Sequence, residues 1–128
     1  MPCDVFSSRT LRRMIDNPNG SIIMDVFEYG QTTVGYAAFL TRSGSLTARL
    51  YSVVILSRFS GQGLIKEYLQ ARLAEFAQKG YLRLVLEVRT TNKAAISLYS
   101  SLGFSVERRL EGYYADGQDG YRMVKYFR

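Results

Sequence analysis

The sequence predicts a mixed α/β (α+β) fold with a central sheet of about six strands. The chain carries several short runs rich in β-branched and aromatic residues, and one long stretch with helical periodicity lies between two of them. The order strand, long helix, strand implies a crossover connection between parallel neighbours. At 128 residues, the chain is expected to form one domain over residues 1–128.

Composition limits the function before any motif is considered. The chain has no His and a single cysteine, Cys3, so an internal disulfide and a thiolate and imidazole metal site are both excluded. Acid and base chemistry must therefore use Asp, Glu, Tyr, Lys or that cysteine. No run approaches the roughly 20 apolar residues of a membrane-spanning helix. Because the N-terminus has no secretory signal pattern, a cytoplasmic protein is expected.

The charge is basic, with 17 Lys and Arg against 11 Asp and Glu, a net charge of +6. This charge suits nucleic acid, an anionic cofactor or acidic proteins, and a solvated basic surface is the structural alternative. The cations are spread along the chain without a basic tail or a recognition motif. A nucleic-acid-binding domain is therefore an alternative that only the net charge favours, and neither nucleic acid nor a membrane is the expected partner.

The N-terminal half predicts one short helix and three strands. Ser7 and Ser8 can cap a helix that runs through Ile15, and the turn residues 17–20 end it. Two β-rich runs, 21–29 and 33–41, are joined by a short glycine-containing connection and predict a hairpin. A third run, 48–56, is rich in apolar and β-branched residues and predicts a largely buried strand.

The C-terminal half predicts two helices and three strands. From Leu64 the apolar residues recur at helical spacing, and Gly80 ends this helix. A strand follows over 82–88, and a second helix over 92–102 stops at a glycine. The last two strands are expected over 104–113 and 121–127, around a turn rich in Asp and Gly.

A glycine turn, Ser60-Gly61-Gln62-Gly63-Leu64, lies between the third strand and the long helix. Such a turn presents unpaired backbone N–H groups and the positive end of the helix dipole, which can bind a pyrophosphate. The pattern is weak by itself, because an ordinary strand-to-helix turn uses glycines in the same way.

The string LEVRTTNKAAISLYSSLGF, residues 86–104, is more specific. It combines a strand end, a helix start and a helix end at fixed spacing. Here the sequence resembles the GNAT superfamily of acyl-CoA-dependent N-acyltransferases, and within it the ribosomal-protein alanine N-acetyltransferases (RimI-like). The resemblance covers about residues 20–128 and is best over 61–114. It implies a GNAT-like mixed sheet and acetyl-CoA as co-substrate, with no metal.

The resemblance also implies roles for individual residues. Glu87 matches the general base, and Tyr99 matches the tyrosine that protonates the departing thiolate. Asn92 matches a cofactor contact, and Arg58 is a further candidate contact to phosphate. The strand before the glycine turn would bind the pantetheine arm, and the turn with the first helical residues would bind the pyrophosphate. These cofactor positions are Val53, Val54, Ile55, Ser60, Gly61, Gln62, Gly63, Leu64 and Ile65.

The residue chemistry agrees with these roles. An amine is mostly ammonium at neutral pH and must lose a proton before it attacks, which a carboxylate can accept. A phenol beside the sulfur can protonate the thiolate that leaves. Structural alternatives remain: Glu87 could be a surface carboxylate paired with Arg89 or Arg83, and Tyr99 could be a core aromatic. Asn92 is a good helix cap in any protein.

The sequence departs from the family pattern at several positions. Ser57, Ser60 and Ile65 stand where the family usually has Pro, Gln or Arg, and a small residue. An alternative alignment starts the motif at Arg58 but shifts its spacing by two. The chain is also expected to lack the family's first strand and helix. The apolar run 21–29 would then be an exposed edge, which residues 2–6 or a second subunit in a homodimer would cover.

The expected function is transfer of an acetyl group to a primary amine by direct attack in a ternary complex. The acceptor would be a peptide or protein N-terminus, or a small-molecule amine. The alternative is a GNAT-like module that binds CoA with little or no catalytic activity, which Ile65 and the short N-terminus favour.

Overall fold

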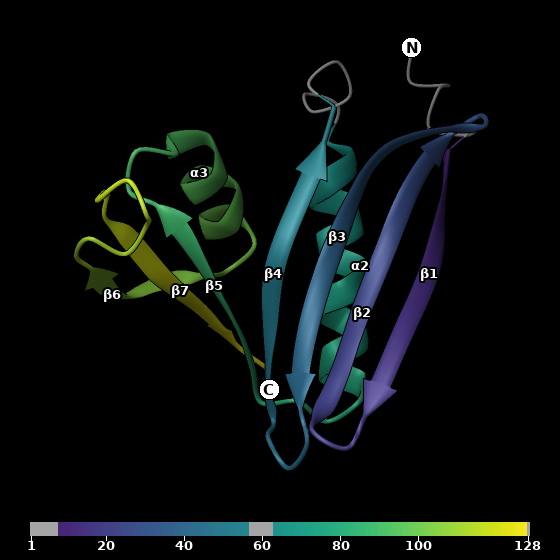
Figure 1. Ribbon diagram of the computed structural model, residues 1–128, viewed down its shortest axis with the longest axis horizontal. Coiled ribbons are helices and arrows are strands. Elements are labelled where there is room, and N and C mark those ends of the chain that lie inside the picture. The colour runs from purple at the N-terminus through teal and green to yellow at the C-terminus, as the bar shows by residue number, and fades with distance from the viewer. Residues whose placement is uncertain (1–7, 57–62, 128) are drawn as a thin grey trace.

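The computed structural model describes residues 8–56 and 63–127 and shows one seven-stranded sheet with helices on one of its faces (Figure 1). The strand order is β1-β2-β3-β4-β5-β7-β6. The described elements are β1 (Ser8–Asn17), β2 (Gly20–Tyr29), β3 (Thr32–Arg42), β4 (Thr47–Ile55), α2 (Leu64–Gln78), β5 (Arg83–Arg89), α3 (Lys93–Ser101), β6 (Ser105–Leu110) and β7 (Gly120–Tyr126).

The helix expected through Ile15 is wrong, because Ser8–Asn17 forms strand β1. β1 pairs antiparallel with β2 along its full length, from Ser8 opposite Tyr29 to Asn17 opposite Gly20. The turn residues Pro18 and Asn19 join the two strands as a hairpin, so they reverse an extended chain instead of ending a helix. This ladder pairs one side of β1 along its whole length and, together with β3, both sides of β2, whereas a short isolated helix is only marginally stable.

This hairpin corrects three further expectations. The sheet has seven strands instead of about six, and an N-terminal strand is present where one was expected to be missing. β1 of the same chain covers the edge of β2, so a second subunit is not needed to cover that edge. Residues 2–6, which were the other expected cover, lie outside the described residues.

The remaining elements confirm the predicted order, with ends that shift by a few residues. β2 and β3 form the predicted hairpin, and β4 pairs antiparallel with β3. The long helix α2 and the shorter helix α3 lie where the periodicity placed them. β4 and β5 are parallel neighbours, as the crossover through α2 requires.

The hydrophobic core lies between the sheet and the two helices. α2 contributes Leu69, Leu73 and Phe76, which recur at the spacing of one helix face. α3 contributes Tyr99 to the same cluster. The other face of the first four strands carries partly exposed apolar side chains, which include Ile22, Met24, Tyr36 and Val54. Within residues 8–56 and 63–127, no helix is both long and apolar enough to cross a membrane.

Candidate active site

The backbones of the two parallel strands at the centre of the sheet, β4 and β5, diverge in the shape of a wedge (Figure 1). Only residues 47–49 of β4 pair with residues 83–85 of β5. The second half of β4 pairs with β3 alone, so its backbone groups on the β5 side have no ladder partner among the described residues. The divergence explains why the second half of β4 is less buried than predicted. Free N–H groups at such a place can polarise a carbonyl.

Val53, Val54 and Ile55, the predicted pantetheine contacts, lie on the diverging half of β4. Val53 and Ile55 also pack against the hydrophobic core, whereas Val54 is 48% exposed on the other face. The side chains of Val53 and Ile55 therefore contact the core, and that of Val54 contacts solvent. The backbone of β4 is what this strand offers to a ligand in the wedge.

The N-terminus of α2 lies beside the end of β4 (Figure 1). Gly63 is the N-cap residue, with φ of 75° and ψ of 3°, a left-handed conformation that favours glycine. Among the described residues, no side chain caps the first turn of the helix, and N–H groups in a first turn without a cap can bind an anion. Leu64 and Ile65 form the first helical turn, and Ile65 packs against the core without preventing the helix from starting. The other predicted residues of this region, Arg58, Ser60, Gly61 and Gln62, lie outside the described residues.

Asn92 caps the N-terminus of α3, as the sequence predicted. Its side-chain oxygen accepts a hydrogen bond from the backbone N–H of Ala95 at 3.1 Å. The side-chain NH2 of Asn92 makes no hydrogen bond within the described part of the chain, so this group can still donate to a ligand. The capping role and the cofactor role are therefore compatible.

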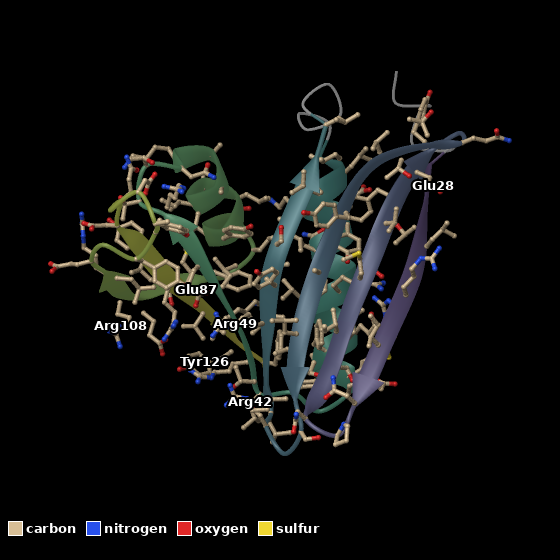
Figure 2. The ribbon with its side chains drawn as sticks, viewed as in Figure 1. Glu28, Arg42, Arg49, Glu87, Arg108 and Tyr126 are labelled. Carbon is tan, nitrogen blue, oxygen red and sulfur yellow. The ribbon has the colours of Figure 1, made fainter. Side chains whose placement is uncertain are left out.

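Glu87 on β5 lies between two arginines. Its carboxylate accepts a hydrogen bond from Nε of Arg122 on β7 at 2.9 Å and contacts Arg49 on β4 (Figure 2). The Glu87 side chain is only 11% exposed. The two cations balance its charge and fix its orientation, so a single carboxylate is held near the base of the wedge.

The alternative in which Glu87 pairs with Arg83 or Arg89 is wrong. Arg89 pairs with Asp116 at 2.9 Å, and Arg83 pairs with Glu107 at 3.4 Å. Neighbours on one face of a strand are about 7 Å apart, whereas residues directly opposite across two strands are closer. Glu87 lies directly opposite Arg122 in the register of β5 and β7. Only the strand order reveals that pairing, and no local signal marked Arg49 or Arg122 in the sequence.

Tyr99 is buried on α3, with 7% of its surface exposed, and its ring packs edge-on against Phe104 at 5.8 Å between centroids. Burial, with a smaller contribution from nearby Tyr114, raises the pKa of Tyr99 to about 12. The phenol is therefore protonated at neutral pH. The alternative that Tyr99 is a core aromatic describes its packing correctly. This packing is compatible with a catalytic role, because the hydroxyl keeps its proton at neutral pH.

Glu87 and Tyr99 approach β5 from opposite faces. Tyr99 shares a core cluster with Leu86 and Val88, and side chains alternate along a strand, so Glu87 points to the other face. No described contact joins the two groups. The structure thus brings Glu87 together with two arginines and places Tyr99 on the helix side of the same strand. No cluster of metal-ligating side chains occurs in the part of the chain that the structure describes.

Comparison with known proteins gives the family. Residues 2–104 match the sequence profile of the Acetyltransferase (GNAT) family. Over 113 residues the chain is 31% identical to an N-alpha-acetyltransferase of Saccharolobus solfataricus, a match that covers 88% of this chain and 65% of that protein. The chain spans between half and two thirds of the length of the first curated relatives that it matches.

Solved structures agree. The fold is similar to that of the ribosomal-protein-S18-alanine N-acetyltransferase from Escherichia coli, with a TM-score of 0.75, 26% identity, and coverage of 88% of this chain and 72% of that one. It is also similar to a GNAT family acetyltransferase from Elizabethkingia anophelis with acetyl-CoA bound, with a TM-score of 0.77, 12% identity, and coverage of 94% and 99%. Together with a profile match over most of its residues, this similarity shows that the chain belongs to the GNAT acetyltransferase family.

Proposed function

We propose that this chain is an acetyl-CoA-dependent N-acetyltransferase, a single acyltransferase domain that acetylates a primary amine by direct attack in a ternary complex. The observation that carries the proposal is the wedge between β4 and β5, with the open N-terminus of α2 at the end of β4 and Glu87 on β5. The acceptor class is a peptide or protein N-terminus, or a small-molecule amine. The relatives named N-alpha-acetyltransferase favour the peptide.

The co-substrate would lie along the diverging half of β4. Backbone groups of Val53 to Ile55 would bind the pantetheine arm, and the N–H groups from Gly63 to Ile65 would bind the pyrophosphate. Ser60, Gly61, Gln62 and Arg58 complete the proposed phosphate site. The free NH2 group of Asn92 is the proposed side-chain contact from α3.

In the reaction, the amine nitrogen attacks the thioester carbonyl carbon, and the carbonyl oxygen becomes an oxyanion that a free N–H of β4 can stabilise. Glu87 accepts the proton that the attacking amine loses, directly or through water. The C–S bond then breaks, and Tyr99 gives its proton to the thiolate, after which solvent reprotonates the phenol. The base and the acid approach from opposite faces of β5, which suits one group that attacks and another that leaves.

The decisive experiment is a calorimetric titration with acetyl-CoA, followed by an acetylation assay on a panel of peptides and small amines. We expect binding at one site, and transfer that Glu87→Gln reduces strongly while acetyl-CoA affinity changes little. Asp119→Asn, a partly exposed carboxylate paired with Arg109 outside the wedge, is the matched control and should retain activity. Binding of acetyl-CoA without acetylation of any amine would favour the second candidate, a CoA-binding module with little or no activity. Absence of acetyl-CoA binding would overturn both.

A further inference from the structure

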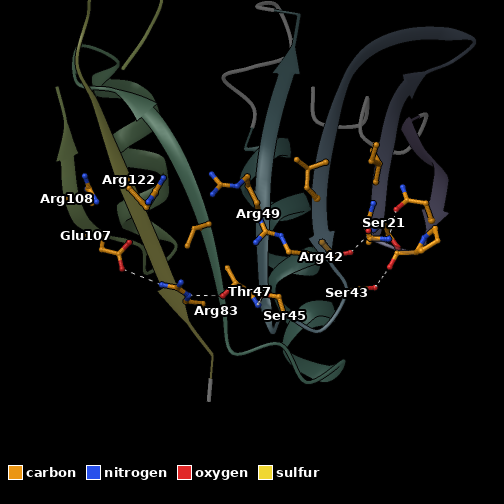
Figure 3. A pocket seen from close by; sticks show the side chains of 18 residues that line it. Ser21, Arg42, Ser43, Ser45, Thr47, Arg49, Arg83, Glu107, Arg108 and Arg122 are labelled. Atoms are coloured by element: carbon orange, nitrogen blue, oxygen red, sulfur yellow. Dashed lines mark hydrogen bonds and ion pairs between the residues drawn. The ribbon is translucent and has the colours of Figure 1, made fainter. Parts of the chain in front are cut away.

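A groove of about 1180 Å³ opens on the sheet face that the helices leave uncovered (Figure 3). Ile22, Leu40 and Val85 supply apolar surface along it, and the turns that join β1 to β2 and β3 to β4 form one end. The other end reaches β6 and β7. Arg49 and Arg122, which hold Glu87, also line this groove, so it begins beside the proposed base.

The groove is strongly cationic. Five arginines line it, and Glu107 is the one acidic residue among its described lining residues; the arginines are Arg42, Arg49, Arg83, Arg108 and Arg122. Glu87 and Glu107 balance part of this charge through Arg49, Arg122 and Arg83. The side chains of Arg42 and Arg108 make no hydrogen bond or ion pair with another described residue.

The strand register adds a second observation. Arg108 on β6 lies directly opposite Arg122 on β7, and like charges directly opposite each other destabilise a sheet. An anionic ligand in the groove would relieve this repulsion. Arginines suit carboxylates in particular, because the planar guanidinium can donate two parallel hydrogen bonds to one carboxylate.

The lining distinguishes a peptide from a nucleic acid. None of the described residues that line the groove is aromatic, whereas proteins that bind single-stranded nucleic acid usually stack bases on aromatic side chains. Apolar side chains along the groove and exposed hydroxyls such as Ser43 on its rim fit an extended polypeptide with mixed side chains. We propose that this groove binds an acidic segment that follows the acceptor amine of a peptide substrate.

This inference rests on the proposed function for the position of the amine at Glu87. With the amine there, the next residues of the peptide would enter the groove past Arg122 and Arg49, and later residues would reach Arg108 or Arg42. The positive charge of the arginines also favours the neutral form of the substrate amine over the ammonium ion, because a further cation beside them is repelled. The same arginines would thus select the acidic segment and help to prepare the nucleophile.

The test uses fluorescent peptides that share the first residue and carry Glu, Gln or Lys at the three following positions. Binding is measured by anisotropy with CoA present, and acetylation kinetics are measured with acetyl-CoA. We expect the Glu peptide to bind about tenfold more tightly than the Gln peptide, with an advantage that decreases as salt increases. The preference should appear in KM, with kcat nearly unchanged.

Variants assign the preference to the groove. Arg42→Gln and Arg108→Gln should each reduce the advantage of the Glu peptide several-fold. Lys125→Gln is the control. Lys125 on β7 lies opposite the buried Leu84 of β5, so it belongs to the helix-covered face of the sheet and not to the groove. This variant removes one positive charge and should leave the preference for the Glu peptide unchanged. Circular dichroism of the three variants verifies that each one is folded.

Equal binding of the three peptides would overturn the inference, and so would a preference that survives both arginine variants. Tighter binding of a single-stranded RNA oligonucleotide than of the Glu peptide would also overturn it. The same experiments test the proposed function separately from the groove. Selective binding of the Glu peptide without acetyl transfer would support the groove and reject the enzyme, whereas acetylation of all peptides without preference would do the reverse.

Discussion

Arg12 on β1 donates two hydrogen bonds to the carboxylate of Asp25 on β2, from Nε at 2.7 Å and from Nη2 at 2.9 Å. Asp25 is fully buried and also accepts a hydrogen bond from the Tyr68 hydroxyl on α2. Arg12 also donates a hydrogen bond from Nη1 to a carboxylate oxygen of Glu75 on α2, at 2.8 Å. A single guanidinium therefore joins the first strand to the helix whose N-terminus is the proposed phosphate site.

Replacement of Arg12 by Met should destabilise the protein by about 3 kcal/mol, because it leaves a fully buried carboxylate without its main cation. Chemical denaturation of the variant and the wild type measures this change. Arg109→Met is the control, since Arg109 pairs with Asp119 at the exposed end of the sheet and should affect the free energy of unfolding little. Equal small effects of both substitutions would show that the buried pair contributes no more than a surface pair.

The stability should fall in acid partly through Asp25. Burial raises the pKa of this carboxyl, but the hydrogen bonds from Arg12 and Tyr68 lower the pKa by more than burial raises it. The net pKa of Asp25 therefore lies below the ordinary 3.8. A depressed pKa in the folded state contributes stability above the ordinary pKa, and this contribution is lost as pH falls through the folded value. Thermal unfolding of wild type and Asp25→Asn between pH 7 and strong acid should show a difference that narrows below about pH 4. A difference that stays constant across that range would contradict the assignment.

Replacement of Tyr99 by Phe should lower turnover about a hundredfold or more, a typical contribution of a general acid, and leave acetyl-CoA affinity nearly unchanged. The ring would keep its packing against Phe104, so the fold should be retained. Because burial raises the pKa of Tyr99 to about 12, this group should not produce a loss of activity in the wild type between pH 7 and 10. Stopped-flow and steady-state assays across that range test both statements. Tyr121→Phe, a partly buried tyrosine on β7, is the control, and unchanged turnover of Tyr99→Phe would remove its catalytic role.

Two substitutions at Asn92 separate its two roles. Asn92→Asp keeps a side-chain oxygen for the Ala95 N–H but removes the NH2 donor, so it should retain stability and weaken acetyl-CoA binding. Asn92→Ala removes the cap as well and should cost about 1 kcal/mol of stability. Calorimetry and thermal unfolding measure the two effects. Full acetyl-CoA affinity in Asn92→Asp would limit this residue to the structural role.

Patterns within one element predicted most of the architecture. The apolar repeat of α2, with Leu69, Leu73 and Phe76 on one face, depends only on the helical period. The cap at Asn92 depends on three neighbouring residues, and the parallel pairing of β4 with β5 followed from the order strand, helix, strand. These features could be predicted because they depend on residues that are near in sequence or on a general rule of topology.

The sequence by itself indicated the family, and it supplied Glu87 and Tyr99 as the proposed base and acid. Only the tertiary structure decided that Ser8–Asn17 is a strand, because its alternatives differ little in local preference and the ladder with β2 supplies the deciding hydrogen bonds. The same holds for the partners of Glu87. Arg49 and Arg122 are 38 and 35 residues away along the chain and meet it through the order of three strands. An ion pair of this kind depends on strand register, and register is a property of the whole sheet.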